Sequence, residues 1–414
     1  MLQKSHLNLK IHRLYIMKKI VTLALCLGTL VSAGAQKTAV DAAKKLAGKT
    51  DQLTEARNLI NGAMQDASTA NDPQTYFIAG KIEFDAFNKA NTLKQTKSDY
   101  QANEDEMGDQ LLNGYKFFLK ALELDQLPNE KGQVKPKVTS SINSTLESRV
   151  GDYWNSGAYF YNNKNYPKAY EAFYDCGDIA SKVKTNMNDS TVAMAFKNAG
   201  LMAYSANELD KAADAFKRAR LTNAADAETF TYEIASWQAA TQKDPSIADT
   251  AKQAIREVAE QGVKVFGTQP LFFLNNIVSY MVDNNQYPEA IACVKEYIEK
   301  DPENGNLYGL LAFVDERSGN SAEAEANYRK VIANENADFD NLKNAAIFLY
   351  KEGTEKLNKV EGNSADARAA KAEILANYFT PASQSAEKAR RLNPNDSRLA
   401  SIIENIDYAI TTYF

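Results

Sequence analysis

Imidazole, the side chain that most often carries acid–base chemistry near neutral pH, is nearly absent from this sequence. The 414-residue chain has two histidines, His6 and His12, and both precede residue 36. A Ser or Cys nucleophile is usually activated by a neighbouring imidazole, and imidazole is also the commonest metal ligand in proteins. Without residues 1–35 the chain has no histidine. It then has no base for a Ser-His-Asp mechanism and no His ligand for zinc.

Two short motifs resemble ligand sites but lack the context that such sites need. Gly48-Lys49-Thr50 matches the end of a phosphate-binding loop, yet Ala43 occupies the place of the first Gly and no Val/Ile-rich strand precedes it. We interpret it as a helix end followed by a turn. The acidic cluster of Asp99 and residues 104–106 lacks the ordered, Gly-containing loop of a calcium site, which favours a solvated face.

We therefore predict that the protein is not an enzyme and that it has no catalytic residue, no cofactor and no metal ion. Paired Asp and Glu side chains can hydrolyse glycosides, and they remain the one enzymatic alternative.

Residues 1–35 have the composition of a secretory signal. Met17-Lys18-Lys19 is a basic start, residues 20–31 are an apolar run of twelve residues, and Ala33-Gly34-Ala35 fits the rule for cleavage before Gln36. Twelve residues make about 18 Å of helix, too short for a hydrocarbon core of about 30 Å. We predict an over-extended start before Met17, cleavage after Ala35 and a Gram-negative periplasmic location.

A retained membrane anchor and a lipid on Cys26 are the alternatives at this end of the chain. A lipobox needs a small residue before its Cys, and here Leu25 precedes it. The two other cysteines, Cys176 and Cys293, lie in helical apolar patterns, and we interpret them as small buried hydrophobes rather than as a disulfide.

Removal of residues 1–35 takes away five basic and no acidic side chains, so the net charge falls from −5 to −10. A negative chain without a basic stripe opposes a phosphate backbone, and we predict no nucleic-acid partner. We also predict no transmembrane segment in the mature chain.

After residue 35 the apolar residues recur at helical spacing almost throughout, as at Ile255, Val258, Ala259, Gly262 and Val263. The pattern is broken by short polar turns, several of which contain Pro at a place where a helix can begin. The sequence therefore predicts an all-α protein.

A repeated frame of small and large residues runs through these helices. Ala169 and Phe173 follow Gly157 by 12 and 16 residues, and Ala212 and Phe216 follow Gly200 in the same way. A weaker copy starts at Ala290, and the next at Ala324, 34 residues later. Small residues let two helices approach closely, and the aromatic four residues on fills the gap beside them. Single pairs cannot bury their apolar faces, so we expect stacked pairs.

This frame resembles the tetratricopeptide repeat (TPR). Aromatic or large residues, Tyr153, Phe196, Leu274 and Tyr308, stand where the family has its first-helix Trp. The resemblance implies a right-handed α-solenoid of antiparallel helix pairs, a TPR-like superhelix, over residues 36–412. It further implies inserted segments near 88–106 and 355–366, the latter as a loop, and a C-terminal capping helix at 397–412.

In this family the first helix of each pair lines a concave groove that holds a peptide or partner segment. Tyr153 already fills the packing position of its helix, so Trp154 is favoured for binding, whereas packing between repeats is the alternative role of Tyr161 and Tyr204. The groove candidates are Phe77 and Phe84, Trp154 and Tyr161, Lys197 and Tyr204, Phe313 and Arg317, and Lys343 and Tyr350.

The resemblance thus favours a periplasmic, non-enzymatic scaffold or adaptor for a protein or peptide partner, with an outer-membrane complex as a candidate place of assembly. The alternative is an exported glycan-binding protein or an outer-membrane accessory of nutrient uptake.

We expect the mature chain to begin at Gln36. Intact-mass spectrometry of the protein from its native cells, with Edman sequencing, checks this expectation. A chain that begins elsewhere, or that carries a lipid on Cys26, contradicts it.

Overall fold

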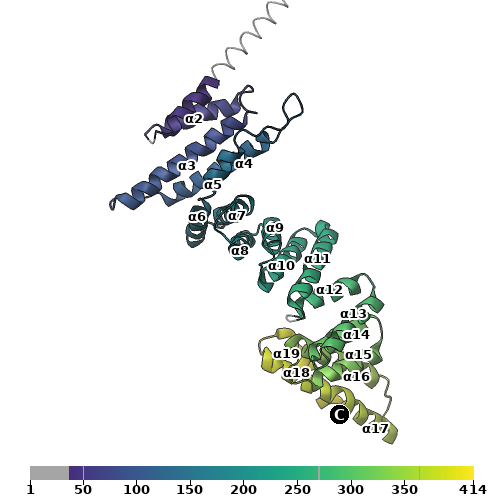
Figure 1. Cartoon of the computed structure of the whole chain (residues 1–414). Coiled ribbons are helices and arrows are strands. Elements are labelled where there is room, and N and C mark those ends of the chain that lie inside the picture. Colours follow the sequence, from purple (N-terminus) through teal and green to yellow (C-terminus); the bar gives the residue numbers. More distant parts are fainter. Residues whose placement is uncertain (1–36, 50, 269–270, 363) are drawn as a thin grey trace, which may run out of the picture. The chain divides into compact units, whose positions relative to one another are not determined.

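The computed structural model describes residues 37–49, 51–268, 271–362 and 364–414 (Figure 1). Within these ranges all regular structure is helical, and no strand occurs. The predicted all-α class is confirmed. The signal segment, with both histidines and Cys26, lies outside the described residues.

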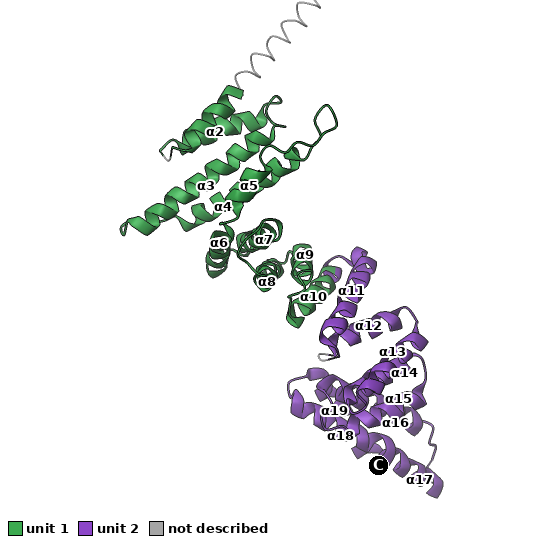
Figure 2. Cartoon of the chain, in the orientation of Figure 1, with its two compact units in different colours: residues 1–240 green, residues 241–414 purple. Residues whose placement is uncertain are grey.

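The chain divides into two compact units, residues 1–240 and 241–414 (Figure 2). In the first, residues 37–47 are helical and the next helices are α2 (Leu53–Gln65), α3 (Pro73–Thr96), α4 (Glu104–Asp125), α5 (Thr139–Leu146), α6 (Val150–Asn162), α7 (Tyr166–Lys182), α8 (Asp189–Ser205), α9 (Leu209–Arg220) and α10 (Ala227–Lys243).

The second unit continues with a short 3₁₀ turn and further helices. These are η1 (Pro245–Ile247), α11 (Ala248–Phe266), α12 (Phe272–Asp283), α13 (Tyr287–Lys300), α14 (Gly305–Arg317), α15 (Ser321–Ala333), α16 (Phe339–Leu357), α17 (Ala365–Ile374), the π-helical turn η2 (Leu375–Phe379), α18 (Thr380–Leu392) and α19 (Ser397–Tyr413).

Neighbouring helices form hairpins, and four of them are joined by the same turn. Lys164, Asn207, Asn285 and Gly319 each have a φ between 58° and 83°, the left-handed conformation that ends a helix. The next residue donates its backbone N–H to the carbonyl five residues back, as from Asn165 to Phe160 at 2.9 Å. Three residues therefore suffice to reverse the chain between α6 and α7, and Asn285 and Gly319 lie 34 residues apart, the spacing predicted for the repeat.

Helices within a pair cross where a glycine faces an aromatic ring. A methyl group on Gly200 would lie 2.6 Å from a ring carbon of Phe216, and one on Gly157 would lie 2.9 Å from the ring of Phe173. No real side chain tolerates such distances, so only Gly admits the ring. The predicted frame of small and large residues is thus confirmed as the crossing point of α6 with α7 and of α8 with α9.

Each unit has several clusters of buried apolar side chains. In the first unit the fully buried rings of Tyr115, Phe118, Tyr153 and Phe160 belong to one of them. In the second, Tyr328 and Phe348 pack at 5.0 Å between ring centroids inside the cluster of α14 to α19. Cys176 is buried and Cys293 half-buried, and both are free thiols.

The inserted segments are more helical than the sequence suggested. Helix α3 continues to Thr96 and α4 begins at Glu104, so most of the insertion near 88–106 lengthens the two helices of one hairpin. The loop predicted over 355–366 is shorter in the structure, because α16 runs to Leu357 and α17 begins at Ala365. The added chain forms α17, which continues through η2 into α18, and α18 packs on α16.

We expect Gly200→Ala to lower the free energy of unfolding by about 1–3 kcal/mol, because the new methyl group overlaps Phe216. Gly62→Ala in α2 is the matched control, since a methyl group there meets nothing within 4 Å and Ala favours a helix by up to about 1 kcal/mol. Thermal unfolding followed by circular dichroism measures both. Equal melting temperatures for the two variants would contradict the crossing model.

Candidate functional site

An apolar groove of the first unit lies between α6 and α8. Trp154, Ala158 and Tyr161 recur on α6 at steps of four and three residues, so they share one face of the helix. Asn198 and Leu201 face them from α8. The side chains enclose a cavity of about 380 Å³ between two first helices of neighbouring pairs.

The floor of this groove belongs to α7. The ring of Phe173 lies beneath Trp154, with 5.5 Å between the ring centroids and a near-perpendicular arrangement. The same Phe173 covers Gly157, so the helix crossing and the groove share one aromatic ring. Trp154 is half-buried, whereas half of the surface of Tyr161 is exposed (50%). An apolar ligand group placed here would bury rings that the chain itself leaves open to water.

Exposed apolar side chains extend this surface along α8. Tyr204 is 37% exposed and Met194 52% exposed. Tyr204 lies three residues after Leu201, on the same helix face, and its ring is 6.5 Å from that of Tyr232 on α10. The groove therefore continues as a partly exposed apolar stripe toward α10.

A charged group borders the stripe. The Lys197 ammonium lies 2.7 Å from a carboxylate oxygen of Asp226 and also pairs with Glu228 at the start of α10. Burial lowers the pKa of Lys197, but the hydrogen bonds and charges of these two carboxylates outweigh it and raise the pKa overall. Lys197 thus stays protonated, and its positive charge is already paired with the carboxylates of Asp226 and Glu228.

Of the predicted residues, Trp154 and Tyr161 line the cavity between α6 and α8. Lys197 and Tyr204 lie on α8 but contact residues at the start of α10 and Tyr232 of α10. Sequence reasoning missed Ala158, Asn198, Leu201 and Met202, which complete the cavity. The helical step of three and four residues from Trp154 and Lys197 would have located Ala158 and Leu201.

Phe84 was wrongly predicted to face a groove. Its side chain is 1% exposed, its ring lies 5.0 Å from that of Phe118, and it covers Gly114 of α4. Phe77 is half-buried and stacks on the same Phe118 at 5.7 Å. The long pairing of α3 with α4 turns this face of α3 toward its own partner helix, which explains the error.

The four candidates of the second unit do not form one site. Phe313 carries the Arg317 guanidinium over its ring at 5.5 Å and packs on the core of α12 to α14. Lys343 is tied to Asp340 and Asp396, at 3.1 and 3.5 Å. Tyr350 packs edge-on against Phe379 at 5.9 Å. All four side chains therefore contact other side chains of the second unit and do not line a shared groove.

Polar side chains of the core were also missed. Asp178 on α7 accepts a hydrogen bond from Tyr115 of α4 at 2.6 Å and pairs with Arg218 of α9 at 2.7 Å and with Lys182 at 2.6 Å. Burial alone would raise the pKa of Asp178, but these donors and charges hold it below its usual range. The carboxylate thus remains charged and links three helices.

A second buried pair joins α9 to α10. The Arg220 guanidinium lies 2.7 Å from a Glu233 carboxylate oxygen, and both side chains are almost fully buried. Removing one partner of such a pair typically costs about 3–5 kcal/mol, because a buried charge is left uncompensated. We assign it to the helix interface.

Among the residues described, no group of three or more His, Cys, Asp or Glu side chains is placed to hold a metal ion. Within the same ranges, no helix combines the length and the apolar character needed to cross a membrane.

Comparison with known proteins gives structural similarity only. No protein-family model and no curated protein matches the chain. It is similar to the structure of a TPR repeats protein from Bacteroides fragilis, with 20% identity, 62% of this chain and 97% of that chain covered, and a TM-score of 0.27. It is also similar to a tetratricopeptide repeat protein from Parabacteroides merdae, with 11% identity, 62% of this chain and 98% of that chain covered, and a TM-score of 0.35.

The C-terminal part of a TPR repeat-containing protein from Cytophaga hutchinsonii is similar at 14% identity, with 60% of this chain and 99% of that chain covered and a TM-score of 0.33. These TM-scores are low. The fold class is therefore assigned from the helix pairs and turns described above.

We expect Phe84→Ala to destabilise the protein by about 3–5 kcal/mol, the cost of emptying a core aromatic site. Tyr161→Ala changes a half-exposed side chain, and we expect its effect to stay within about 0.5 kcal/mol. Urea unfolding followed by circular dichroism compares the two. A large loss of stability in Tyr161→Ala would place Tyr161 in the core and not in the groove.

Proposed function

We propose that the protein is a TPR-like, non-enzymatic scaffold that binds a protein or peptide segment in the groove between α6 and α8. The observation that carries this proposal is the half-exposed pair Trp154 and Tyr161 above a floor of Phe173. Aromatic anchors supply much of the energy of protein interfaces. Both aromatic side chains remain partly exposed to solvent, and α6 holds them in fixed positions.

The groove suits an apolar side chain of a partner segment. Its volume of about 380 Å³ fits a few side chains and not a folded domain. Asn198 offers an amide at the edge, which can pair with the backbone of a bound segment. A partner segment would therefore place an apolar residue beneath Tyr161 and a peptide group near Asn198.

We further propose a periplasmic location, with association to an outer-membrane complex. The support is the sequence of residues 1–35, with its basic start, apolar run and Ala33-Gly34-Ala35 cleavage pattern.

Glycan binding is a second candidate, and a separate cavity favours it. Between α3, α4 and α6 a cavity of about 320 Å³ is lined by polar side chains that include Asn91, Asp152, Asn155 and Tyr159 above the buried ring of Phe87. Amides, carboxylates and hydroxyls are the groups that pair with sugar hydroxyls.

The test is photo-crosslinking in intact native cells. A benzophenone amino acid in place of Tyr161 is expected to give a covalent adduct with a defined protein, because this side chain borders the groove. The same substitution at Tyr408, which is 64% exposed on α19, is the matched control and is expected not to give that adduct.

Identical adducts from both positions, or no protein adduct from position 161, would overturn the groove assignment. Retention of the purified protein on a polysaccharide column, lost on Asn155→Ala, would instead support the glycan-binding candidate.

A further inference from the structure

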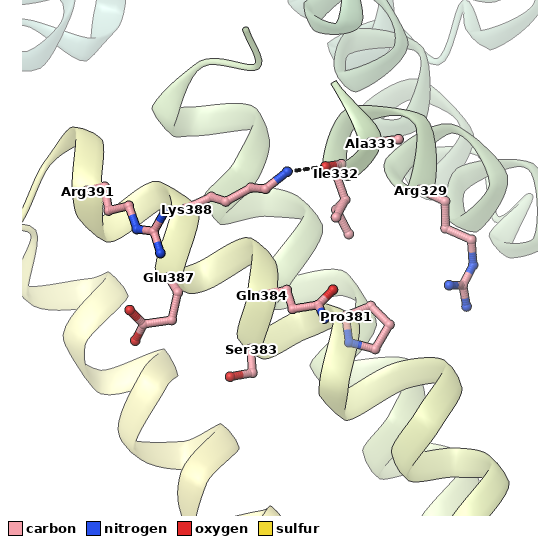
Figure 3. Close-up of a pocket in the computed structure, with 9 residues that line it drawn as sticks. All are labelled: Arg329, Ile332, Ala333, Pro381, Ser383, Gln384, Glu387, Lys388 and Arg391. Atoms are coloured by element: carbon pink, nitrogen blue, oxygen red, sulfur yellow. Dashed lines mark hydrogen bonds between the residues drawn. The ribbon is translucent and has the colours of Figure 1, made fainter. Parts of the chain in front are cut away.

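A second groove lies between α15 and α18, two helices that are the second members of their pairs (Figure 3). It encloses about 620 Å³ and has an apolar floor that includes Ile332 and Pro381. Arg329 borders it from α15, and Lys388 and Arg391 border it from α18. The groove is independent of the one between α6 and α8.

Two of these cations are not matched by a carboxylate. Lys388 crosses the groove and donates a hydrogen bond to the Ile332 carbonyl at 2.6 Å, the contact drawn in Figure 3. An ammonium has three donors, so two remain. Arg391 is exposed and forms no salt bridge with any residue in the described ranges.

The remaining charges of the groove are accounted for. Arg329 pairs with Glu325 at 2.8 Å and donates to the Asn377 carbonyl in η2 at 2.7 Å. Glu387 pairs at 2.7 Å with Arg390, which does not line the groove. The excess positive charge of the groove therefore comes from Lys388 and Arg391.

We propose that this groove binds an extended, acidic peptide segment in which acidic and apolar residues alternate. Lys388 and Arg391 are three residues apart on α18, so their Cβ atoms lie about 5–6 Å apart. Alternate side chains of an extended peptide repeat every ~7 Å on one side, which matches two carboxylates to these two cations. The apolar residues between them point to the opposite side of the peptide, toward Ile332 on α15.

A peptide fits this groove better than a longer polyanion does. The two unmatched cations lie three residues apart on one helix, so the positive patch is long enough for two carboxylates and too short for a continuous row of phosphates. A short segment with two carboxylates meets only the local positive charge.

The test is isothermal titration calorimetry of the full chain with two blocked synthetic peptides, the Asp–Val peptide Val-Asp-Val-Asp-Val and the Asn–Val peptide, in which Asn replaces each Asp. We expect Arg391→Gln to weaken binding about fivefold, the upper range for one exposed ion pair. Raising the salt from about 0.01 M to about 0.15 M shortens the Debye length from ~30 to ~8 Å and should weaken binding further. Arg368→Gln on α17, an exposed Arg outside the groove, is the matched control and should bind like the parent chain.

Three results would overturn the proposal. The first is that the parent chain, folded as judged by its cooperative thermal unfolding, does not bind the Asp–Val peptide. Another is equal binding of the Asn–Val peptide, which keeps the shape and removes the charge. The third is single-stranded DNA that binds in an Arg391-dependent way while the acidic peptide does not. A lower melting temperature in Lys388→Gln would reflect its bond to Ile332, which is why Arg391 is the primary variant.

Discussion

The contact of an aromatic ring with a glycine on the facing helix is the constraint on which the rest of the structure depends. It occurs at Gly157 with Phe173 and at Gly200 with Phe216, and it sets how closely the helices of a pair approach. At Phe173 the same ring also forms the floor beneath Trp154. The geometry of the candidate groove is therefore fixed by the crossing, and a change in one would move the other.

Local sequence was enough to predict the helices, the crossing residues and two of the groove rings, because each depends on spacing within about one repeat. Trp154 and Tyr161 follow from the helical period together with the family resemblance, which turns one face of the first helix toward a groove. Phe84 has the same spacing from Phe77, yet it is core, because α4 is long and carries Gly114 opposite that ring. No pattern in α3 alone reveals the partner helix that covers it.

Long-range polar contacts were beyond the reach of the sequence for a different reason. Asp178 lies 63 residues from Tyr115 and 40 residues from Arg218. The apolar pattern that predicts the helices gives no information about the partner of a polar residue such as Asp178. The buried pair of Arg220 and Glu233 reads as ordinary surface charge in the sequence. Such contacts become visible only when neighbouring pairs are stacked, and they fix which faces of the helices meet.

The hairpin turns have a consequence for how the chain reaches this structure. Each turn is three residues long and joins helices that pack directly on one another. Closing so short a loop takes little conformational entropy, and folding rates rise as contacts become more local. A pair such as α8 and α9 can therefore form as soon as both helices exist, with stability growing as each further pair docks. Asp178 and Arg220 gain their partners on other helices only when the adjoining helices dock.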